Sequence, residues 1–219
     1  MAHDPNSQTA NTSTASSALA PTVYFGYGSN LWLHQMHIRC PTSQYLGIAR
    51  LRNYRWIIND RGYANVVQIP EYDRANVSGK GPYDNVVFGV VYSLQEADER
   101  RLDKNEGVPI AYTKEYLRCD FWSSSKDQKI DVSEPPTSSK DMLVYIDRER
   151  TTPDEPRTEY VYRMNQGIAD AEKLGVPKEY VKDVMRKFIP AEKGESRKSM
   201  EEFAAKQAAR FKDESGVFK

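Results

Sequence analysis

Strand-like segments dominate the first part of this chain, and no long helical segment separates them. Short runs of β-branched and aromatic residues, bounded by turn signals, extend from Val23 to about Phe121. A doubly wound nucleotide-binding fold requires long helices between its strands, so this pattern argues against such a fold. The expected strands cover residues 23–28, 44–51, 54–59, 63–69, 85–94, 111–122 and 141–146.

Helical periodicity becomes prominent only in the last third of the chain. One short charged helix is expected directly before Gly107. From Tyr160 onward the period is helical, with one helix closed by Gly175 and a second opened by Pro177. Residues 197–213 favour a final helix, and its propensity alone leaves open whether it docks onto the core. We therefore expect an α+β fold in which a small mixed, largely antiparallel, barrel-like β-sheet carries flanking helices.

Two polar segments between the expected strands are rich in turn-forming residues. Residues 71–84 and 123–140 are predicted to be exposed loops, and residues 60–62 are predicted to connect two strands of a hairpin. Both loops are long for such connections. We hypothesise that they frame the mouth of a pocket.

The ends of the chain differ in composition from its centre. Residues 1–21 are rich in Ser, Thr, Ala and Asn, which predicts a disordered tail without the basic and apolar regions of a secretory signal. The expected domain covers residues 22–190, and residues 191–219 are expected to form a charged C-terminal helix or tail. No stretch approaches the roughly 18 apolar residues of a membrane span. We expect a cytoplasmic protein with no membrane partner.

Charge and cysteine content exclude several classes of protein. Lys plus Arg and Asp plus Glu each number 31, so no overall field attracts nucleic acid, and no nucleic-acid partner is expected. The two cysteines, Cys40 and Cys119, have no CxxC spacing and no histidine cluster nearby. Neither a disulfide framework nor a metal site is therefore expected, and a reducing compartment fits best.

The segment VYFGYGSNLW, residues 23–32, places two glycines and a Ser-Asn pair where a strand ends and a helix begins. Such a junction presents unpaired backbone N–H groups and a positive helix end, which bind carboxylate or phosphate. The spacing matches neither a dinucleotide fingerprint nor a P-loop, so carboxylate is favoured. A tight turn in which Ser29 or Asn30 caps the helix remains the alternative interpretation.

Two motifs together resemble the gamma-glutamylcyclotransferase family. They are YFGYGSNL from Tyr24 and LDKNEGV from Leu102, and the similarity extends over roughly residues 23–190, as a fungal-type variant with inserts. The resemblance implies a gamma-glutamylcyclotransferase-like fold and a catalytic domain at residues 22–190. It also implies a reaction without metal or organic cofactor, in which the substrate's α-amine attacks its own γ-carbonyl. The products would be 5-oxoproline and an amino acid, dipeptide or amine.

The resemblance also implies roles for individual residues. Glu106 would be the general acid/base, because one carboxyl within reach of both nitrogens can serve both proton transfers. The alternative is that Glu106 is a solvated residue in the last turn of a charged helix. Asp103, one turn earlier, is expected to be a cap or surface acid. The residues implied to bind substrate are Tyr24, Phe25, Gly26, Tyr27, Gly28, Ser29, Asn30, Tyr112 and Tyr160, with Tyr162 as the alternative to Tyr160.

Several questions stay open at this point. The implied partner is a small molecule: a gamma-glutamyl amino acid, a peptide or a glutathione conjugate. A non-catalytic ligand-binding or scaffold protein and a gamma-glutamylamine cyclotransferase are the alternatives. Arg50 and Arg52 are either surface charges of a strand or contacts for the distal carboxylate of glutathione. The oligomeric state is open, with a homodimer among the options.

Overall fold

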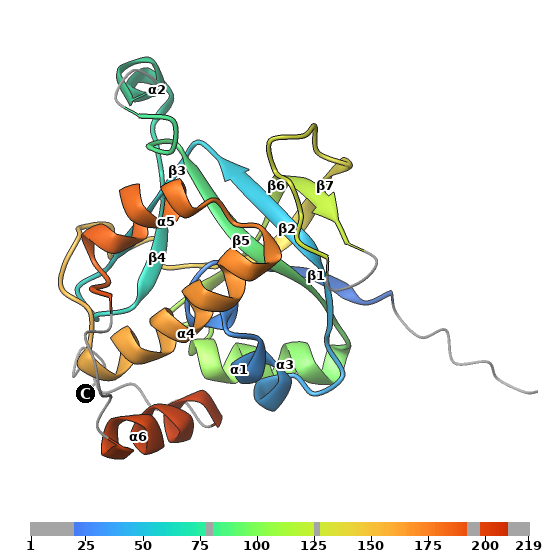
Figure 1. Cartoon of the computed structure of the whole chain (residues 1–219), viewed down its shortest axis with the longest axis vertical. Helices are drawn as coiled ribbons and strands as arrows, with labels where there is room; N and C mark the ends of the chain where they lie inside the picture. The colour runs from blue at the N-terminus through green and yellow to red at the C-terminus, as the bar shows by residue number, and fades with distance from the viewer. Residues whose placement is uncertain (1–19, 78–80, 125–127, 192–197, 210–219) are drawn as a thin grey trace, which may run out of the picture.

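A closed five-stranded β-barrel forms the centre of the protein (Figure 1). The computed structural model describes residues 20–77, 81–124, 128–191 and 198–209. Around the barrel the strands are, in order, β1 (Thr22–Gly26), β5 (Val86–Leu94), β2 (Gln44–Arg52), β6 (Thr113–Ser123) and β7 (Ser138–Ile146). Neighbours are antiparallel except β1 and β7, which pair in parallel through Tyr24 and Leu143 and close the barrel. The predicted mixed, largely antiparallel barrel is confirmed.

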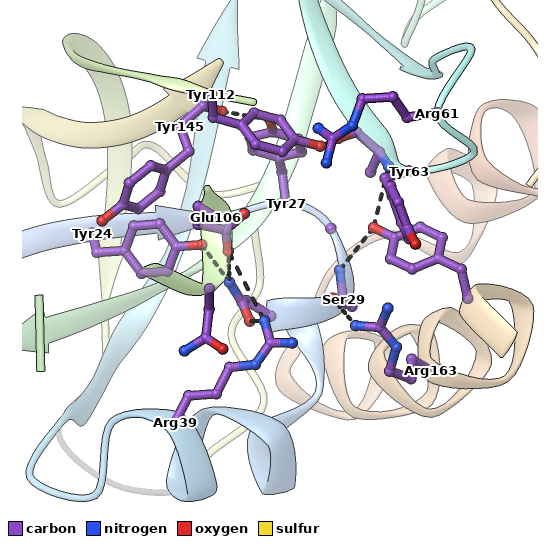
Figure 2. Close-up of a pocket in the computed structure, with 15 residues that line it drawn as sticks. Tyr24, Tyr27, Ser29, Arg39, Arg61, Tyr63, Glu106, Tyr112, Tyr145 and Arg163 are labelled. Atoms are coloured by element: carbon purple, nitrogen blue, oxygen red, sulfur yellow. Dashed lines mark hydrogen bonds and ion pairs between the residues drawn. The ribbon is translucent and has the colours of Figure 1, made fainter. Parts of the chain in front are cut away.

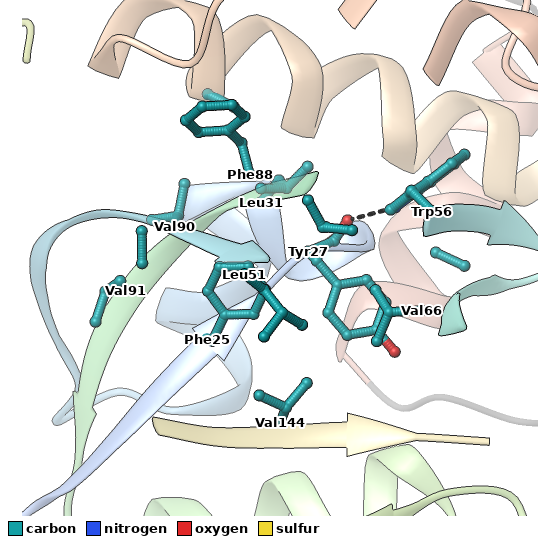
Figure 3. Packing of buried hydrophobic residues seen from close by; sticks show 14 of the residues in the cluster. Phe25, Tyr27, Leu31, Leu51, Trp56, Val66, Phe88, Val90, Val91 and Val144 are labelled. Carbon is teal, nitrogen blue, oxygen red and sulfur yellow. Dashed lines mark hydrogen bonds between the residues drawn. The ribbon is translucent and has the colours of Figure 1, made fainter. Parts of the chain in front are cut away.

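A separate hairpin, β3 (Tyr54–Ile58) and β4 (Ala64–Gln68), lies beside the barrel. Its connection contains the predicted turn, in which Gly62 adopts a left-handed φ of 83° and donates its N–H to the Asn59 carbonyl at 2.8 Å. Trp56 Nε1 donates to the Tyr27 carbonyl at 2.9 Å (Figure 3). This bond ties the hairpin to the glycine-rich segment.

Most of the helices gather at one side of the barrel, whereas the short helix at residues 71–77 lies apart from them (Figure 1). α4 (Thr158–Leu174) packs against the 3-10 turn η1 (Ser29–Leu31) and against α6 (Lys198–Ala209), and α1 (Leu33–Arg39) packs against α6 and α3 (Glu96–Glu106). Gly107 and Gly175 end α3 and α4 as predicted, both with positive φ. The remaining helical elements beside the barrel are α5 (Lys178–Asp183) and the 3-10 turn η2 (Met185–Lys187).

Two sequence predictions need correction. The segment predicted as a loop at residues 71–84 contains the helix α2, Glu71–Val77. Pro70 precedes it, and acids occupy its first turn, where they favour the positive helix end. Seven residues are too few for a helical period to be recognised. The helix predicted from Pro177 is divided into α5 and η2, and such 3-10 turns commonly occur at helix ends.

Several predicted segments lie wholly or partly outside the described residues. They include residues 1–19 of the predicted tail and parts of both predicted loops. Of the C-terminal segment, α6 is described, and it is docked: Ala204 and Ala208 are fully buried, and Gln207 is 3% exposed. This finding answers the question of docking that its helix propensity left open.

The barrel core is built by apolar side chains from every strand (Figure 3). Phe25 is fully buried, and its ring lies over Gly89 of β5. A methyl group on Gly89 would lie 2.6 Å from the Gly26 carbonyl oxygen and 2.7 Å from the Phe25 ring. The missing side chain at position 89 therefore allows β1 to approach β5 closely just before the glycine-rich segment.

Both cysteines are buried free thiols. Burial raises the pKa of Cys40 and of Cys119 to about 12, so both thiols are protonated at neutral pH. In the described ranges, no helix combines the length and the apolar character needed to cross a bilayer.

We predict that Gly89→Ala destabilises the protein by about 1–3 kcal/mol, because the added methyl group overpacks the contact between β1 and β5. Chemical denaturation would measure the change in the free energy of unfolding. Gly81→Ala is the control, because a methyl group there would meet only the flexible Asp84 side chain, at 3.1 Å or more. Equal effects of the two substitutions would contradict this account of the packing.

Candidate active site

A polar pocket lies where η1, the end of α3, the β3–β4 hairpin and α4 meet (Figure 2). Among the described residues that line it, Glu106 carries the only carboxyl group. Arginines and tyrosines provide most of the remaining charge and hydrogen-bonding capacity; they are Arg39, Arg61, Arg163, Tyr24, Tyr27, Tyr63, Tyr112, Tyr145 and Tyr160. No cluster of three or more potential metal ligands occurs within the described ranges.

Glu106 is the last residue of α3, and its side chain turns into the pocket with 17% exposure. Its Oε1 accepts a hydrogen bond of 2.9 Å from Asn30 Nδ2 and lies 4.0 Å from Arg39 Nη1. Burial raises the pKa of the Glu106 carboxyl above its ordinary value. Arg39, the Asn30 hydrogen bond, Arg61 and Arg163 oppose that rise.

Asn30 connects the glycine-rich segment to the rest of the site. Besides binding Glu106, its Nδ2 donates to the Tyr24 hydroxyl at 2.8 Å, and its Oδ1 accepts from Gln35 Nε2 at 2.8 Å and from Arg39 Nη1 at 3.2 Å. The capping role considered for Ser29 or Asn30 is wrong, since neither η1 nor α1 has a side-chain cap. The Asn30 side chain instead serves the pocket.

Tyr160 anchors the other side of the segment. Its hydroxyl accepts hydrogen bonds from the backbone N–H groups of Ser29, at 3.1 Å, and Ala64, at 3.3 Å. A methyl group on Gly28 would lie 2.8 Å from this hydroxyl, so the glycine makes the contact possible. Tyr162, the alternative that alignment left open, packs edge-on against Trp32 and does not line the pocket.

The structure brings most of the predicted site residues together, but not all. The predicted residues that line the pocket are Glu106, Tyr24, Tyr27, Gly28, Ser29, Asn30, Tyr112 and Tyr160. Phe25 and Gly26 lie outside it. Because side chains alternate along a strand, Tyr24 and Phe25 face opposite sides of β1, and Phe25 enters the barrel core. A side chain at position 26 would point toward Asn30 and Tyr24.

Several pocket tyrosines bind backbone carbonyl groups or a carboxylate through their hydroxyl groups. Tyr112 donates to the Ala64 carbonyl at 2.9 Å, and Tyr27 donates to the Tyr145 carbonyl at 2.5 Å. Burial raises the pKa of each of these phenols, so they stay protonated and act as hydrogen-bond donors. The Tyr145 hydroxyl donates to Asp103 at 2.7 Å, so Asp103 is more than a solvated surface acid.

Three buried arginines were missed by the sequence analysis. Arg163 binds both carboxylate oxygens of Glu159, at 2.8 and 2.9 Å, and donates to Ser29 Oγ at 3.1 Å. It follows Tyr160 by three residues on α4, so helical spacing could have identified it. The sequence analysis interpreted Arg61 only as a turn residue. No sequence motif indicated that Arg39 lies in the site. Arg50 and Arg52 instead bind Asp120, at 2.8 and 2.7 Å, and lie outside the pocket.

Arg39 and Arg61 face the Glu106 carboxyl group from different walls of the pocket (Figure 2). The Arg61 guanidinium lies 5.4 Å from the ring centre of Tyr63 and 5.3 Å from that of Tyr112, within cation–π range. Burial, with Arg163 nearby, lowers the pKa of Arg39 to about 10, so Arg39 is still charged at neutral pH. The pocket is therefore positively charged around one acid, which suits an anionic ligand.

Comparisons with known proteins point to one family. A family model described as "Gamma-glutamyl cyclotransferase, AIG2-like" matches residues 24–179. Proteins named gamma-glutamylcyclotransferase from Bos taurus and Homo sapiens are 31% identical over 87 residues and 27% identical over 96 residues. Each of these matches covers 39% of this chain and 44% of the relative, less than half of its length.

Solved structures show the same fold. A structure described as gamma-glutamyl cyclotransferase has a TM-score of 0.57 and 21% identity, covering 84% of this chain and 98% of that one. A structure of an uncharacterized Homo sapiens protein gives the same TM-score and identity, covering 85% and 99%. At this identity the likeness establishes the barrel fold and its flanking helices.

We predict that Tyr160→Phe lowers the free energy of unfolding by about 1–3 kcal/mol, because the Ser29 and Ala64 N–H groups lose their buried acceptor. Tyr162→Phe is the matched control and should have the smaller effect, since its hydroxyl accepts neither bond. Chemical denaturation of both variants would test the assignment. A larger loss for Tyr162→Phe would contradict it.

We also predict that Glu106→Gln makes the protein more stable at neutral pH. A folded-state pKa above the unfolded value means that wild-type stability from this group is lost as pH rises through the folded pKa. The gain in melting temperature should therefore grow from pH 4 to pH 7. Glu96→Gln, at an exposed site on the same helix, should give little change across this range. A Glu106→Gln protein that is less stable at pH 7 would contradict the assigned burial cost.

Proposed function

Because this chain belongs to the AIG2-like gamma-glutamyl cyclotransferase family, we propose that it cyclises a gamma-glutamyl group, releasing 5-oxoproline, with Glu106 as general acid/base. The observation that carries the proposal is the meeting of Glu106 with Asn30 in a pocket that also contains Gly28 and Ser29. A scaffold protein has no need of a partly buried acid facing such a pocket. The enzyme is therefore favoured over the non-catalytic alternative.

The reaction needs several proton transfers at one place. At neutral pH the α-amine of the substrate is protonated, so Glu106 first removes a proton. The free amine attacks the γ-carbonyl carbon, and the carbonyl oxygen becomes an oxyanion. Glu106 then returns the proton to the departing nitrogen, and the oxyanion re-forms the carbonyl as the carbon–nitrogen bond to the leaving amino acid, dipeptide or amine breaks. The ring nitrogen gives up its second proton, which passes through Glu106 to the released amine, so that this amine departs as an ammonium group. The five-membered ring of 5-oxoproline remains.

The surroundings of Glu106 suit these transfers. A pKa raised by burial brings the carboxyl closer to the working pH, which favours a group that must accept and release the same proton. General acid/base catalysis of this kind contributes about 10²- to 10⁴-fold in rate. Since Asn30 Nδ2 fixes one carboxylate oxygen, the other oxygen is the better placed to meet the substrate.

Positioning of the substrate supplies the rest of the proposed rate enhancement. Curling the glutamyl chain so that its amine meets its carbonyl makes the reaction intramolecular, and effective molarities of about 10⁵ M or more are known for such reactions. Donors aimed at the developing oxyanion add about 2.7–4 kcal/mol each. Arg61 and Arg163, with the phenols of the pocket, are candidates for holding the substrate's carboxylate.

The identity of the substrate belongs to the same proposal. We propose a gamma-glutamyl amino acid, a peptide or a glutathione conjugate as substrate, and a gamma-glutamylamine remains the alternative. A cytoplasmic location and a homodimeric assembly stay predictions. Comparison of leaving groups would separate the substrate classes, because the chemistry at the glutamyl group is the same in each.

We predict that incubation of the wild-type protein with gamma-glutamyl-alanine, glutathione and gamma-glutamyl-lysine yields 5-oxoproline from at least one of them. Glu106→Gln should lower turnover by about 10²-fold or more while substrate binding persists, because the amide cannot accept the proton. The value of kcat/KM should fall as pH drops below the raised pKa of Glu106, since the base becomes protonated.

Asp103→Asn is the control on the same helix. Asp103 binds Tyr145 and Lys114 and does not line the pocket, so this variant should keep most of its turnover. A Glu106→Gln variant within about tenfold of wild type would exclude the assigned role. Binding of a gamma-glutamyl compound without any 5-oxoproline would favour the non-catalytic alternative.

A further inference from the structure

We propose that α6 is a functional part of the site: its C-terminal carbonyl groups hold Arg39 against Asn30 and Glu106, so that docking of the helix positions this arginine. Arg39 is thereby a positioning residue for the acid/base group. The inference rests on the proposed function of Glu106. The helix concerned, residues 198–209, lies beyond the stretch that the family model matches, residues 24–179.

The contact between Arg39 and α6 is made by backbone atoms of the last helical turn. Arg39 Nε donates to the Ala208 carbonyl at 2.8 Å, and Nη2 donates to the Gln207 carbonyl at 3.0 Å. The last carbonyl groups of a helix have no partner within the helix and carry its partial negative charge. A guanidinium group therefore binds this helix end through both hydrogen bonds and charge.

The same guanidinium group reaches the acid/base centre on its other side (Figure 2). Arg39 Nη1 donates to Asn30 Oδ1 at 3.2 Å and lies 4.0 Å from Glu106 Oε1. Asn30 in turn donates to that carboxylate oxygen. A continuous series of contacts thus leads from the α6 backbone through Arg39 and Asn30 to Glu106.

Close packing of small side chains brings α6 to this position. Ala204 and Ala208 are fully buried, and α6 packs against both α1 and α4. Arg39 itself is only 4% exposed. Displacing α6 would remove two carbonyl acceptors from a buried guanidinium, which costs free energy and releases the side chain from its fixed geometry.

Arg39 has a definite electrostatic effect on Glu106. Burial raises the pKa of Glu106, and among the groups that lower this pKa Arg39 acts most strongly. The other charged or titratable groups facing Glu106 come from the remaining walls of the pocket, and Arg39 also faces Arg163. They are Arg61, Arg163, Tyr24, Tyr27, Tyr112, Tyr145 and Tyr160, together with the buried thiol of Cys40 next to Arg39. Moving Arg39 away therefore raises the pKa of Glu106 further and depletes the base at a given pH.

The test uses two tryptophan substitutions in the full-length chain. Ala204→Trp cannot be accommodated in the buried face of α6, whereas Ala205→Trp lies on its exposed face next to it. We expect Ala204→Trp to lower kcat/KM on the order of tenfold at the acid end of the profile, with recovery at higher pH, because a contact to a charged group is lost. Ala205→Trp should have the wild-type profile.

Arg39→Gln provides the second arm, in case the tryptophan disturbs folding. This variant should move the acid limb of kcat/KM to higher pH as Ala204→Trp does, and the double variant should show no further shift, because both act through one contact. Arg39→Gln should also speed hydrogen exchange of the α6 backbone amides. A merely structural contribution of Arg39 would lower stability without moving the pH limb.

A direct titration keeps this inference separate from the proposed function. Carbon-13 NMR of the glutamate carboxyl groups, assigned with Glu106→Gln, reports the pKa of Glu106 whether or not 5-oxoproline is formed. An upward shift in Ala204→Trp and Arg39→Gln, but not in Ala205→Trp, supports the inference. An unchanged Glu106 pKa in folded Arg39→Gln, or unchanged exchange in α6, overturns it even if the wild-type enzyme is active.

Discussion

The hydrogen bond from Asn30 to Glu106 is the contact on which the site depends. It joins two residues 76 positions apart in the sequence and fixes the one carboxyl group among the described pocket residues. Even a partly buried carboxyl is costly unless it is hydrogen-bonded, so the elements that carry Asn30 and Glu106 must be held in register. The barrel supplies that register, because β1 leads directly into η1 and β5 leads directly into α3.

The arginines around this bond are themselves buried and therefore need partners. Arg163 uses a carboxylate one turn earlier on α4, and Arg39 uses the backbone of α6. Both then extend a remaining nitrogen toward the glycine-rich segment, to Ser29 and Asn30 respectively. Helices far apart in sequence thus support the same short turn, and the site is assembled by tertiary packing around a local motif.

The sequence predicted the fold class well because its evidence is local. Runs of β-branched residues without intervening helices indicated the barrel, and Gly107 and Gly175 marked two helix ends. The residues that could not be predicted depend on distant partners. Arg39 looks like any arginine at a helix end until α6 packs beside it, and Phe25 looks like its pocket-lining neighbour Tyr24 until strand alternation separates them. The short helix α2 was not predicted, because seven residues are too few to show a clear helical period.

The parallel pairing of β1 with β7 has a consequence for local opening of the barrel. Within the described strands, β1 and β7 pair through Tyr24 and Leu143, whereas β1 pairs with β5 along its whole length. Parallel pairing is also slightly weaker per residue, so transient fraying of the barrel costs least along this seam. Because Tyr24 closes the seam with its backbone and accepts a hydrogen bond from the Asn30 amide with its hydroxyl, such fraying would loosen this wall of the pocket before the rest of the barrel.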